Sequence, residues 1–253
     1  MHPTLFKFGP LMLSSYGAML ILGFWACTRL AQRRARRLPP ESRAITAEEL
    51  IDVTSLSLLG GIVGGRLLYA LLHGAWFLES PWELLKLWHG GLVWYGGFIG
   101  GLLAGWFYVR ARRLDFLRVL DQCIPFLPLG HALGRIGCFL NGCCYGRPTE
   151  AWCGVLFPGH PGPVLPTQLF EAAGLCVLFL VLRLLQQPAM LRHRGRLFGL
   201  YLIGYAALRF GLEFLRGDQT VFWWGLTLQQ IISVGMIVIG GILVARSESK
   251  GSR

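Results

Sequence analysis

The chain has 253 residues, of which 54% are hydrophobic and only 15% are charged, and its mean hydropathy is +0.52. A soluble domain carries about 25% charged residues, so the composition argues against an ordinary soluble enzyme and excludes disorder, collagen and coiled coil. The net charge of +11 lies in short clusters between apolar runs, which is typical of a polytopic membrane protein and not of a nucleic-acid-binding surface.

Apolar runs long enough to cross the hydrocarbon of a bilayer, about 20 residues each, recur along the chain. The first has its basic cluster after it, so we interpret it as a retained helix and not as a cleavable signal peptide. We therefore predict an all-α fold, a single transmembrane domain over residues 1–253 with seven membrane-spanning helices. These are expected over residues 11–30, 50–73, 93–110, 116–133, 167–187, 197–215 and 227–245.

The basic residues alternate between the two sides of this arrangement. Most of the 24 lie in the connections after the first, third and fifth spans and in the C-terminal tail. The positive-inside rule then predicts a cytoplasmic C-terminus and an N-terminus outside. The outer side receives residues 74–94, 134–166 and 216–226, and the segment 134–166 is expected to be the longest non-helical stretch.

Three arginines and a glutamate fall within or beside the predicted spans, where charge is costly and usually faces a cavity or a partner. Arg66 follows the glycine-rich segment GGIVGG and could pair with a carboxylate or bind a lipid phosphate. Arg209 and Glu213 are four residues apart on one helix face, and Arg216 lies three residues beyond. They form either an ion pair that helps helices to pack or a water-lined phosphate site, since a guanidinium donates two hydrogen bonds to phosphate.

Residues 130–149, GHALGRIGCFLNGCCYGRPT, combine glycines with Arg135, Asn141 and Arg147. We interpret the segment as a tight re-entrant turn or as a backbone that closely approaches a ligand.

Two tyrosines near the outer ends of spans, Tyr16 and Tyr95, are either interfacial anchors or hydroxyls that a ligand can reach.

Four cysteines are predicted on the outer side, where disulfides can persist: Cys138, Cys143, Cys144 and Cys153. Either of the two adjacent ones could pair with Cys138 or Cys153, or the thiols could stay free. Zinc binding is a further alternative, although the spacing C-x4-C-C-x8-C is not a standard zinc pattern.

The chain resembles the prolipoprotein diacylglyceryl transferase family over nearly its whole length. The similarity lies in blocks that follow the family's order: SSYGAMLILGF, GGIVGGRLLY, WHGGLVWYGGFIGG, GRIGCFLNGCCYGRPT, PTQLFEA, YAALRFGLEFLRGD and GLTLQQIISV. The resemblance implies transfer of a diacylglyceryl group from phosphatidylglycerol to the lipobox cysteine thiol of a prolipoprotein, with a thioether formed and glycerol 1-phosphate released. It implies a multi-pass protein of the bacterial cytoplasmic (inner) membrane with its active site toward the outer leaflet. We expect no cofactor, no metal and no nucleic-acid partner.

The resemblance also implies the site residues. Arg135 and Arg209 match arginines that are essential in the family and would stabilise charge on the leaving phosphate. Glu213 matches a carboxylate that orients an arginine or accepts a proton, and Tyr95 is the fourth predicted catalytic residue. The residues predicted to bind lipid or phosphate are Tyr16, Arg66, Asn141, Gly142, Gly146, Arg147 and Arg216.

Three positions depart from the family pattern: Tyr95 stands where the family has histidine, Cys138 where it has asparagine and Cys143 where it has glutamate. Tyrosine has a pKa near 10 and is a poor base at neutral pH. Either another group activates the thiol, with Glu213, His89 and His131 as candidates, or the substrate differs. Two alternatives therefore stay open, a divergent phospholipid-dependent transferase with another acceptor and a non-catalytic lipid-binding or transport protein.

Overall fold

The computed structural model describes residues 4–8, 11–74, 77, 80–86, 90–217 and 221–249. These residues are mostly helical, as the sequence predicted. Helical segments long and apolar enough to cross a membrane number four in the described part of the chain, and they cover Pro40–Leu72, Phe116–Asn141, Thr167–Leu185 and Leu228–Ser247.

The longer helices are α1 (Ser15–Arg37), α2 (Ala47–Leu72), α4 (Trp94–Ala111), α6 (Leu127–Asn141), α7 (Thr167–Leu185), α9 (Arg196–Glu213) and α10 (Leu228–Ser249). The shorter ones are η1 (Pro40–Ser42), η2 (Pro81–Leu85), α5 (Phe116–Cys123), η4 (Ile124–Phe126) and α8 (Pro188–Leu191). Two antiparallel hairpins complete the described elements, β1 (Thr4–Phe8) with β2 (Leu11–Ser14) and β3 (Val221–Trp223) with β4 (Leu226–Thr227).

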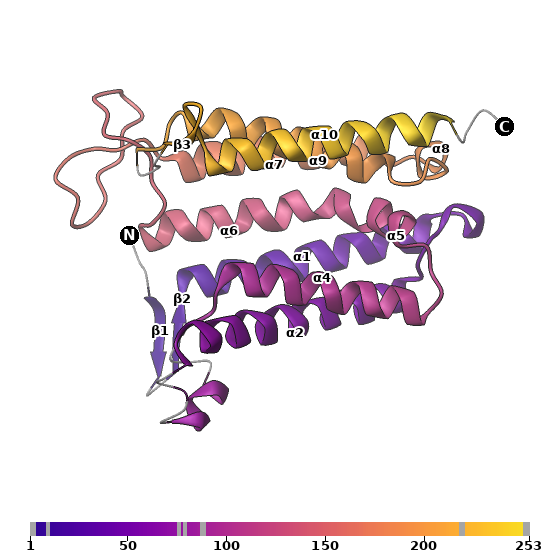
Figure 1. Cartoon of the computed structure of the whole chain (residues 1–253), viewed down its shortest axis with the longest axis horizontal. Coiled ribbons are helices and arrows are strands. Elements are labelled where there is room, and N and C mark those ends of the chain that lie inside the picture. The colour runs from indigo at the N-terminus through magenta and orange to yellow at the C-terminus, as the bar shows by residue number, and fades with distance from the viewer. Residues whose placement is uncertain are drawn as a thin grey trace.

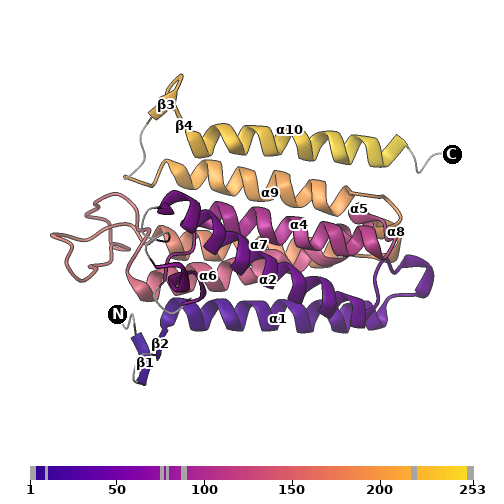
Figure 2. The same cartoon turned by 60° about the horizontal axis from the view of Figure 1, so that its bottom comes forward.

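The longer helices run side by side along one direction (Figure 1). Helix α2 packs on α4 and α1, α1 packs on α6, and α6 packs on α7. Helix α7 contacts α9, and α9 packs on α10. The second view separates α9 and α10 from α1 at opposite edges of the bundle (Figure 2). The arginine-rich connections gather at one end of the bundle, while both hairpins and the loop 142–166 lie at the other.

Polar side chains define where the helices begin. The hydroxyl of Ser14 accepts the N–H of Gly17 at 3.0 Å and caps α1. Thr46 and Glu49 form a capping box at the start of α2. The caps fix the chain direction at points where it enters a long apolar helix.

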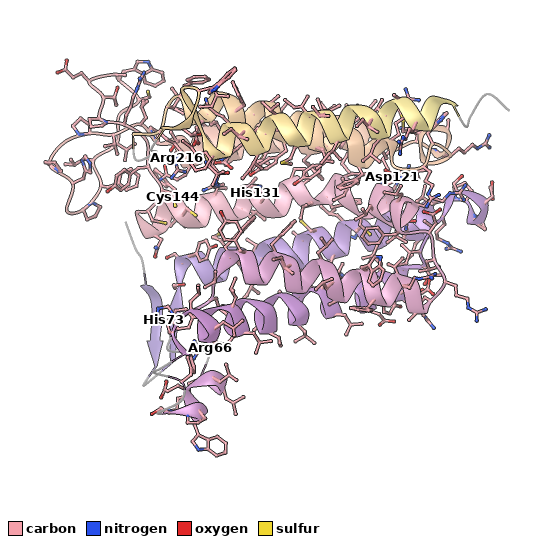
Figure 3. All side chains as sticks on the ribbon, viewed as in Figure 1. Arg66, His73, Asp121, His131, Cys144 and Arg216 are labelled. Atoms are coloured by element: carbon pink, nitrogen blue, oxygen red, sulfur yellow. The ribbon has the colours of Figure 1, made fainter. Side chains whose placement is uncertain are left out.

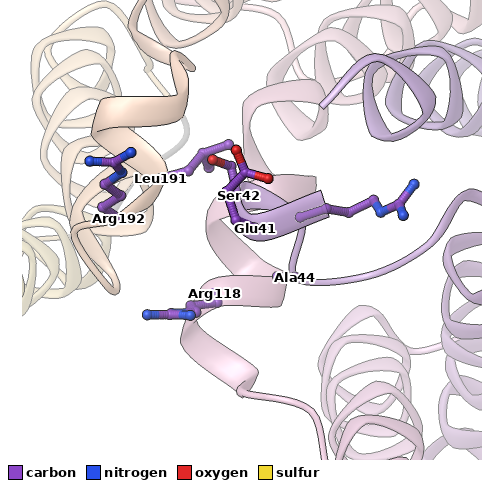
Figure 4. A pocket seen from close by; sticks show the side chains of 7 residues that line it. Glu41, Ser42, Ala44, Arg118, Leu191 and Arg192 are labelled. Atoms are coloured by element: carbon purple, nitrogen blue, oxygen red, sulfur yellow. The ribbon is translucent and has the colours of Figure 1, made fainter. Parts of the chain in front are cut away.

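The end with the basic connections is held by buried polar side chains. Gln122 of α5 donates to the carbonyl of Ile45 at 2.9 Å. Asp121 beside it accepts the N–H of Phe198 at 2.8 Å and so caps the first turn of α9. A small pocket lies here (Figure 4), lined by Glu41, Ser42, Arg43, Ala44, Arg118, Leu191 and Arg192. The α1–α2 connection, α5 and α9 are therefore tied together at this end.

Several element boundaries differ from the sequence prediction, and two of them lie at the loop end of the bundle. The first span was expected from residue 11, but residues 11–14 pair as β2 and α1 begins at Ser15. The loop region 134–166 was expected to be non-helical, but α6 continues to Asn141 and ends at Gly142, whose φ is +77°. The reason is packing, because a Cβ atom on Gly137 would lie 3.1 Å from Met19 of α1. This glycine lets two helices approach and does not make a turn.

Helices α2 and α4 approach closely through glycines on both sides, so Gly100→Ala is expected to destabilise the fold. The added Cβ would lie 2.2 Å from the carbonyl oxygen of Gly60, and overpacking of this kind costs about 1–3 kcal/mol. The midpoint of thermal unfolding in detergent should fall. Gly241→Ala is the matched control, because a Cβ there meets nothing within 4 Å. Equal midpoints for the two variants would contradict the prediction.

Candidate functional site

Helices α6 and α7 bring an arginine and a glutamate together inside the bundle. The Nε atom of Arg135 lies 3.0 Å from Oε2 of Glu171, and the side chain of Glu171 is only 4% exposed. His131, one turn earlier on α6, places its Nε2 atom 3.6 Å from Oε1 of the same carboxylate. Glu171 is therefore shared between a guanidinium and an imidazole from one helix face.

A second ion pair lies on α9. Arg209 and Glu213 are four residues apart, and their side chains are in contact. Nη2 of Arg209 is 2.9 Å from Oε2 of Glu213. The other oxygen of Glu213 accepts a hydrogen bond at 2.7 Å from the hydroxyl of Thr227, the last residue of β4. The Nη1 atom of Arg209 is buried and has no hydrogen-bond partner among the described residues. Glu213 thus holds the guanidinium from one side and leaves one donor available.

The two ion pairs belong to one electrostatic cluster. His131 and Tyr205 each interact with Glu171, Arg135 and Arg209, and the rings of His131 and Tyr205 are 5.3 Å apart. Two arginines and two glutamates balance in charge, which is needed because unpaired charge inside an apolar bundle is very costly. A phosphate that entered here would meet guanidinium groups already held in place.

The end of α6 carries three thiols next to this cluster. The Sγ atoms of Cys138, Cys143 and Cys144 all lie within 4.8 Å of one another. Cys144 interacts electrostatically with Arg135 and Arg216, and it lies with Arg216 at the loop end of the bundle (Figure 3). All the cysteines are free thiols in the structure, so the disulfide, one of the alternatives that the sequence left open, is not formed.

The loop after α6 is anchored through its backbone. Gln168 donates to the carbonyl of Cys143 at 2.7 Å, and the hydroxyl of Thr167 donates to the carbonyl of Cys144 at 3.2 Å. Gly146 is buried where a Cβ atom would lie 2.6 Å from the carbonyl oxygen of Leu215, just after α9. The glycine therefore allows the loop to pack on the end of α9.

The two loop thiols differ in acidity. Burial raises the pKa of Cys143. Hydrogen bonding by Cys138 and Cys143, with help from the positive charges of Arg135 and Arg216, lowers the pKa of Cys144 to about 5 against the opposing effect of burial.

Cys144 is therefore expected to react with iodoacetamide almost as fast at pH 6 as at pH 8. An ordinary thiol slows about tenfold per pH unit below its pKa, because only the thiolate is nucleophilic. A group with a lowered pKa keeps its thiolate until the pH falls toward that value. Peptide mapping by mass spectrometry measures the rate, and Cys144→Ser should remove the fast-reacting site. A steep fall in the labelling of Cys144 between pH 8 and pH 6 would contradict the lowered pKa.

Several predicted site residues meet at this place. Arg135, Arg209 and Glu213 form the cluster, and Tyr16 of α1 interacts electrostatically with Arg135. The side chain of Asn141 hydrogen-bonds to Cys143. The rest of this set lies in or beside the same loop: Gly142 at the end of α6, Gly146, Arg147, whose N–H donates to the carbonyl of Leu215, and Arg216.

Arg66 and Tyr95 lie elsewhere. Arg66 is 3% exposed, and its guanidinium donates to backbone carbonyls of the α2–α4 connection, among them Leu84 at 3.1 Å and Gly91 at 3.2 Å. Among the described residues of this connection it pairs with no carboxylate, and its guanidinium holds the connection through the carbonyls. Its role in binding phosphate stays a prediction. Tyr95 is 54% exposed and packs edge-on against Trp94 at 5.3 Å. His89 lies outside the described residues.

The sequence prediction missed Glu171 and Tyr205. Glu171 is an acidic residue in the apolar run 167–187, so the cost of intramembrane charge was a signal that should have marked it. Tyr205 gives no such signal, because a tyrosine within an apolar helix is ordinary. Only the packing of α6 against α7 and α9 reveals that it borders the cluster.

Comparison with known proteins gives a consistent result. The family model described as prolipoprotein diacylglyceryl transferase matches residues 3–246. A phosphatidylglycerol--prolipoprotein diacylglyceryl transferase of Cupriavidus metallidurans is 37% identical, over 99% of this chain and 94% of its own length. Proteins of the same name are 41% identical in Pseudoalteromonas atlantica (95% of this chain, 86% of that protein) and 36% identical in Clostridium tetani (95% of both).

Proposed function

The chain belongs to the prolipoprotein diacylglyceryl transferase family, and from this premise we propose that it transfers a diacylglyceryl group from phosphatidylglycerol to a prolipoprotein. The acceptor is the thiol of the lipobox cysteine. A carbon–sulfur bond forms as the bond between the diacylglyceryl carbon and the phosphate oxygen breaks. The products are a thioether and glycerol 1-phosphate, and the thiol proton leaves.

The observation that carries this proposal is the cluster of two buried Arg–Glu pairs on α6, α7 and α9. The leaving phosphate gains negative charge as the carbon–oxygen bond breaks, and guanidinium groups fixed in advance stabilise that charge most strongly. Arg209 has a buried Nη1 donor without a partner, which suits a phosphate oxygen. Arg135 supplies the second positive charge, oriented by Glu171.

The proposed setting is the bacterial inner membrane. A single transmembrane domain of seven helices, with the N-terminus outside and the C-terminus in the cytoplasm, accounts for the basic connections that gather at one end of the bundle. The cluster lies toward the opposite end, near the loop 142–166 (Figure 3). The reaction would then take place on lipid of the outer leaflet.

The test is lipidation with purified protein. Phosphatidylglycerol vesicles and a synthetic lipobox peptide are incubated with the protein, and mass spectrometry looks for a diacylglyceryl adduct on the peptide cysteine. A peptide with serine in place of that cysteine and vesicles of phosphatidylethanolamine are the controls. An adduct with the cysteine peptide and phosphatidylglycerol alone is expected. Folded protein that gives none, beside an active relative, would favour another acceptor or a non-catalytic lipid-binding protein.

A further inference from the structure

The three thiols at the end of α6 are arranged as a set of metal ligands. Their Sγ atoms lie within 4.8 Å of one another, and a zinc ion bound to thiolates at about 2.3 Å requires sulfur atoms about 3.8 Å apart. Closing this gap needs a movement of about 1 Å or less, which side-chain rotation of Cys143 and Cys144 can supply. Cys138 is 9% exposed and fixed within the helix, so it provides a rigid first ligand.

The backbone brings the two adjacent loop cysteines to the same point. Cys144 has a φ of +64°, which is rare for a residue other than glycine and is favoured where a site demands it. This bend allows the side chains of Cys143 and Cys144 to reach Cys138 together. Gln168 and Thr167 hold the backbone of the same two residues in place, because they donate to the carbonyls of Cys143 and Cys144.

Charge favours a cation bound by three thiolates at this place. One divalent ion and three thiolates carry a net charge of −1, and the guanidinium groups of Arg135 and Arg216 both interact favourably with a thiolate at Cys144. Soft thiolate ligands select zinc or copper(I) over magnesium and calcium. Three protein ligands are also the number found in catalytic zinc sites, which keep a fourth position open.

We propose that Cys138, Cys143 and Cys144 bind a thiophilic metal ion, with Zn²⁺ as the first choice, and that its open position accepts the sulfur of the acceptor cysteine. The second half of this proposal rests on the proposed function. The acceptor thiol loses its proton to solvent as the sulfur–metal bond forms, since a metal ion acidifies a bound thiol. The sulfur then attacks the diacylglyceryl carbon, and glycerol 1-phosphate leaves with the electron pair of the broken carbon–oxygen bond.

This arrangement would explain how the thiol is activated in a chain that has Tyr95 at the family's histidine position. Tyr95 lies on α4 against Trp94, while the three thiols lie beside Arg135. The metal therefore places the attacking sulfur next to the guanidinium groups that receive the phosphate. A metal site here departs from the expectation of no metal that was drawn from the sequence, and it rests on the proximity of the three thiols.

The first test is cobalt binding to the full-length protein, purified in detergent, reduced and stripped with a chelator. Co²⁺ should produce thiolate-to-metal charge-transfer absorption at one ion per chain, and Zn²⁺ should abolish it. Single variants Cys138→Ser, Cys143→Ser and Cys144→Ser should each weaken the absorption, while the control Cys153→Ser should retain it. Circular dichroism checks that each variant is folded. No absorption in the wild type, or equal loss in Cys153→Ser, would overturn the site.

The second test adds the lipobox peptide to the cobalt-loaded protein. Charge-transfer absorption should rise with the cysteine peptide and stay constant with the serine peptide, because a further thiolate joins the metal. An unchanged spectrum with both peptides would overturn the role in acceptor binding and leave a structural metal site.

Lipidation rates separate this inference from the proposed function. Removal of the metal should slow diacylglyceryl transfer about 100-fold, because the group that promotes loss of the thiol proton is then missing. Added Zn²⁺ should restore the rate. The lipidation rate could instead be the same in the metal-stripped protein, in the protein with Zn²⁺ restored and in the variant with all three cysteines changed to serine. That result would overturn the metal's role in catalysis but not the transferase function. If the protein bound cobalt and the lipobox peptide but lipidated no peptide, the proposed function would be contradicted and the metal site would stand.

Discussion

Arg209→Lys is expected to slow diacylglyceryl transfer by about 100- to 1,000-fold, the loss seen when one fixed donor to a developing charge is removed. Lysine keeps a positive charge beside Glu213, whose Oε2 atom lies 2.9 Å from Nη2 of Arg209, so the bundle should still fold. It loses the planar fork whose buried Nη1 donor we assign to the phosphate. Initial rates of peptide lipidation measure the effect.

Arg194→Lys is the matched control for this variant. Arg194 also forms an ion pair, with Asp115 at 2.9 Å, but it lies at the opposite end of the bundle and half of its side chain is exposed. Its lipidation rate should equal that of the wild type. A rate for Arg209→Lys within a few-fold of this control would show that the fork is not used in the reaction.

Glu171→Gln is expected to have the largest effect on stability. Its carboxylate is the anion that Arg135 and His131 share, and breaking a buried ion pair by removing one partner costs about 3–5 kcal/mol. The midpoint of thermal unfolding in detergent should fall and lipidation should be lost. Glu150→Gln, in the exposed part of the loop after α6, should change neither.

A double variant, Arg135→Gln with Glu171→Gln, separates stability from catalysis. It removes both charges, so no uncompensated guanidinium stays in the bundle and part of the lost stability should return. Lipidation should stay absent because the phosphate has lost a guanidinium. If the double variant regained activity together with stability, Arg135 would have only a structural role.

Much of the helical framework was predictable from local sequence. Apolar runs and their caps mark helices that the structure places close to the expected ranges, because hydropathy and capping act within a few residues of the chain. The spacing of Arg209 and Glu213 predicted a shared helix face for the same reason, and the ion pair that was one of the two alternatives for these residues is formed. The end of α6 was misplaced, because a glycine used for helix contact looks the same in sequence as one used for a turn.

The sequence by itself therefore determined the helices, the helix face shared by Arg209 and Glu213 and the resemblance that led to the transferase family. The tertiary structure alone decided the contacts between distant segments: Glu171 with Arg135, Arg66 with backbone carbonyls, and three thiols gathered beside the arginines. The physical reason is that such contacts depend on which faces of α6, α7 and α9 meet. Packing of the whole bundle sets those faces, and no local pattern records them.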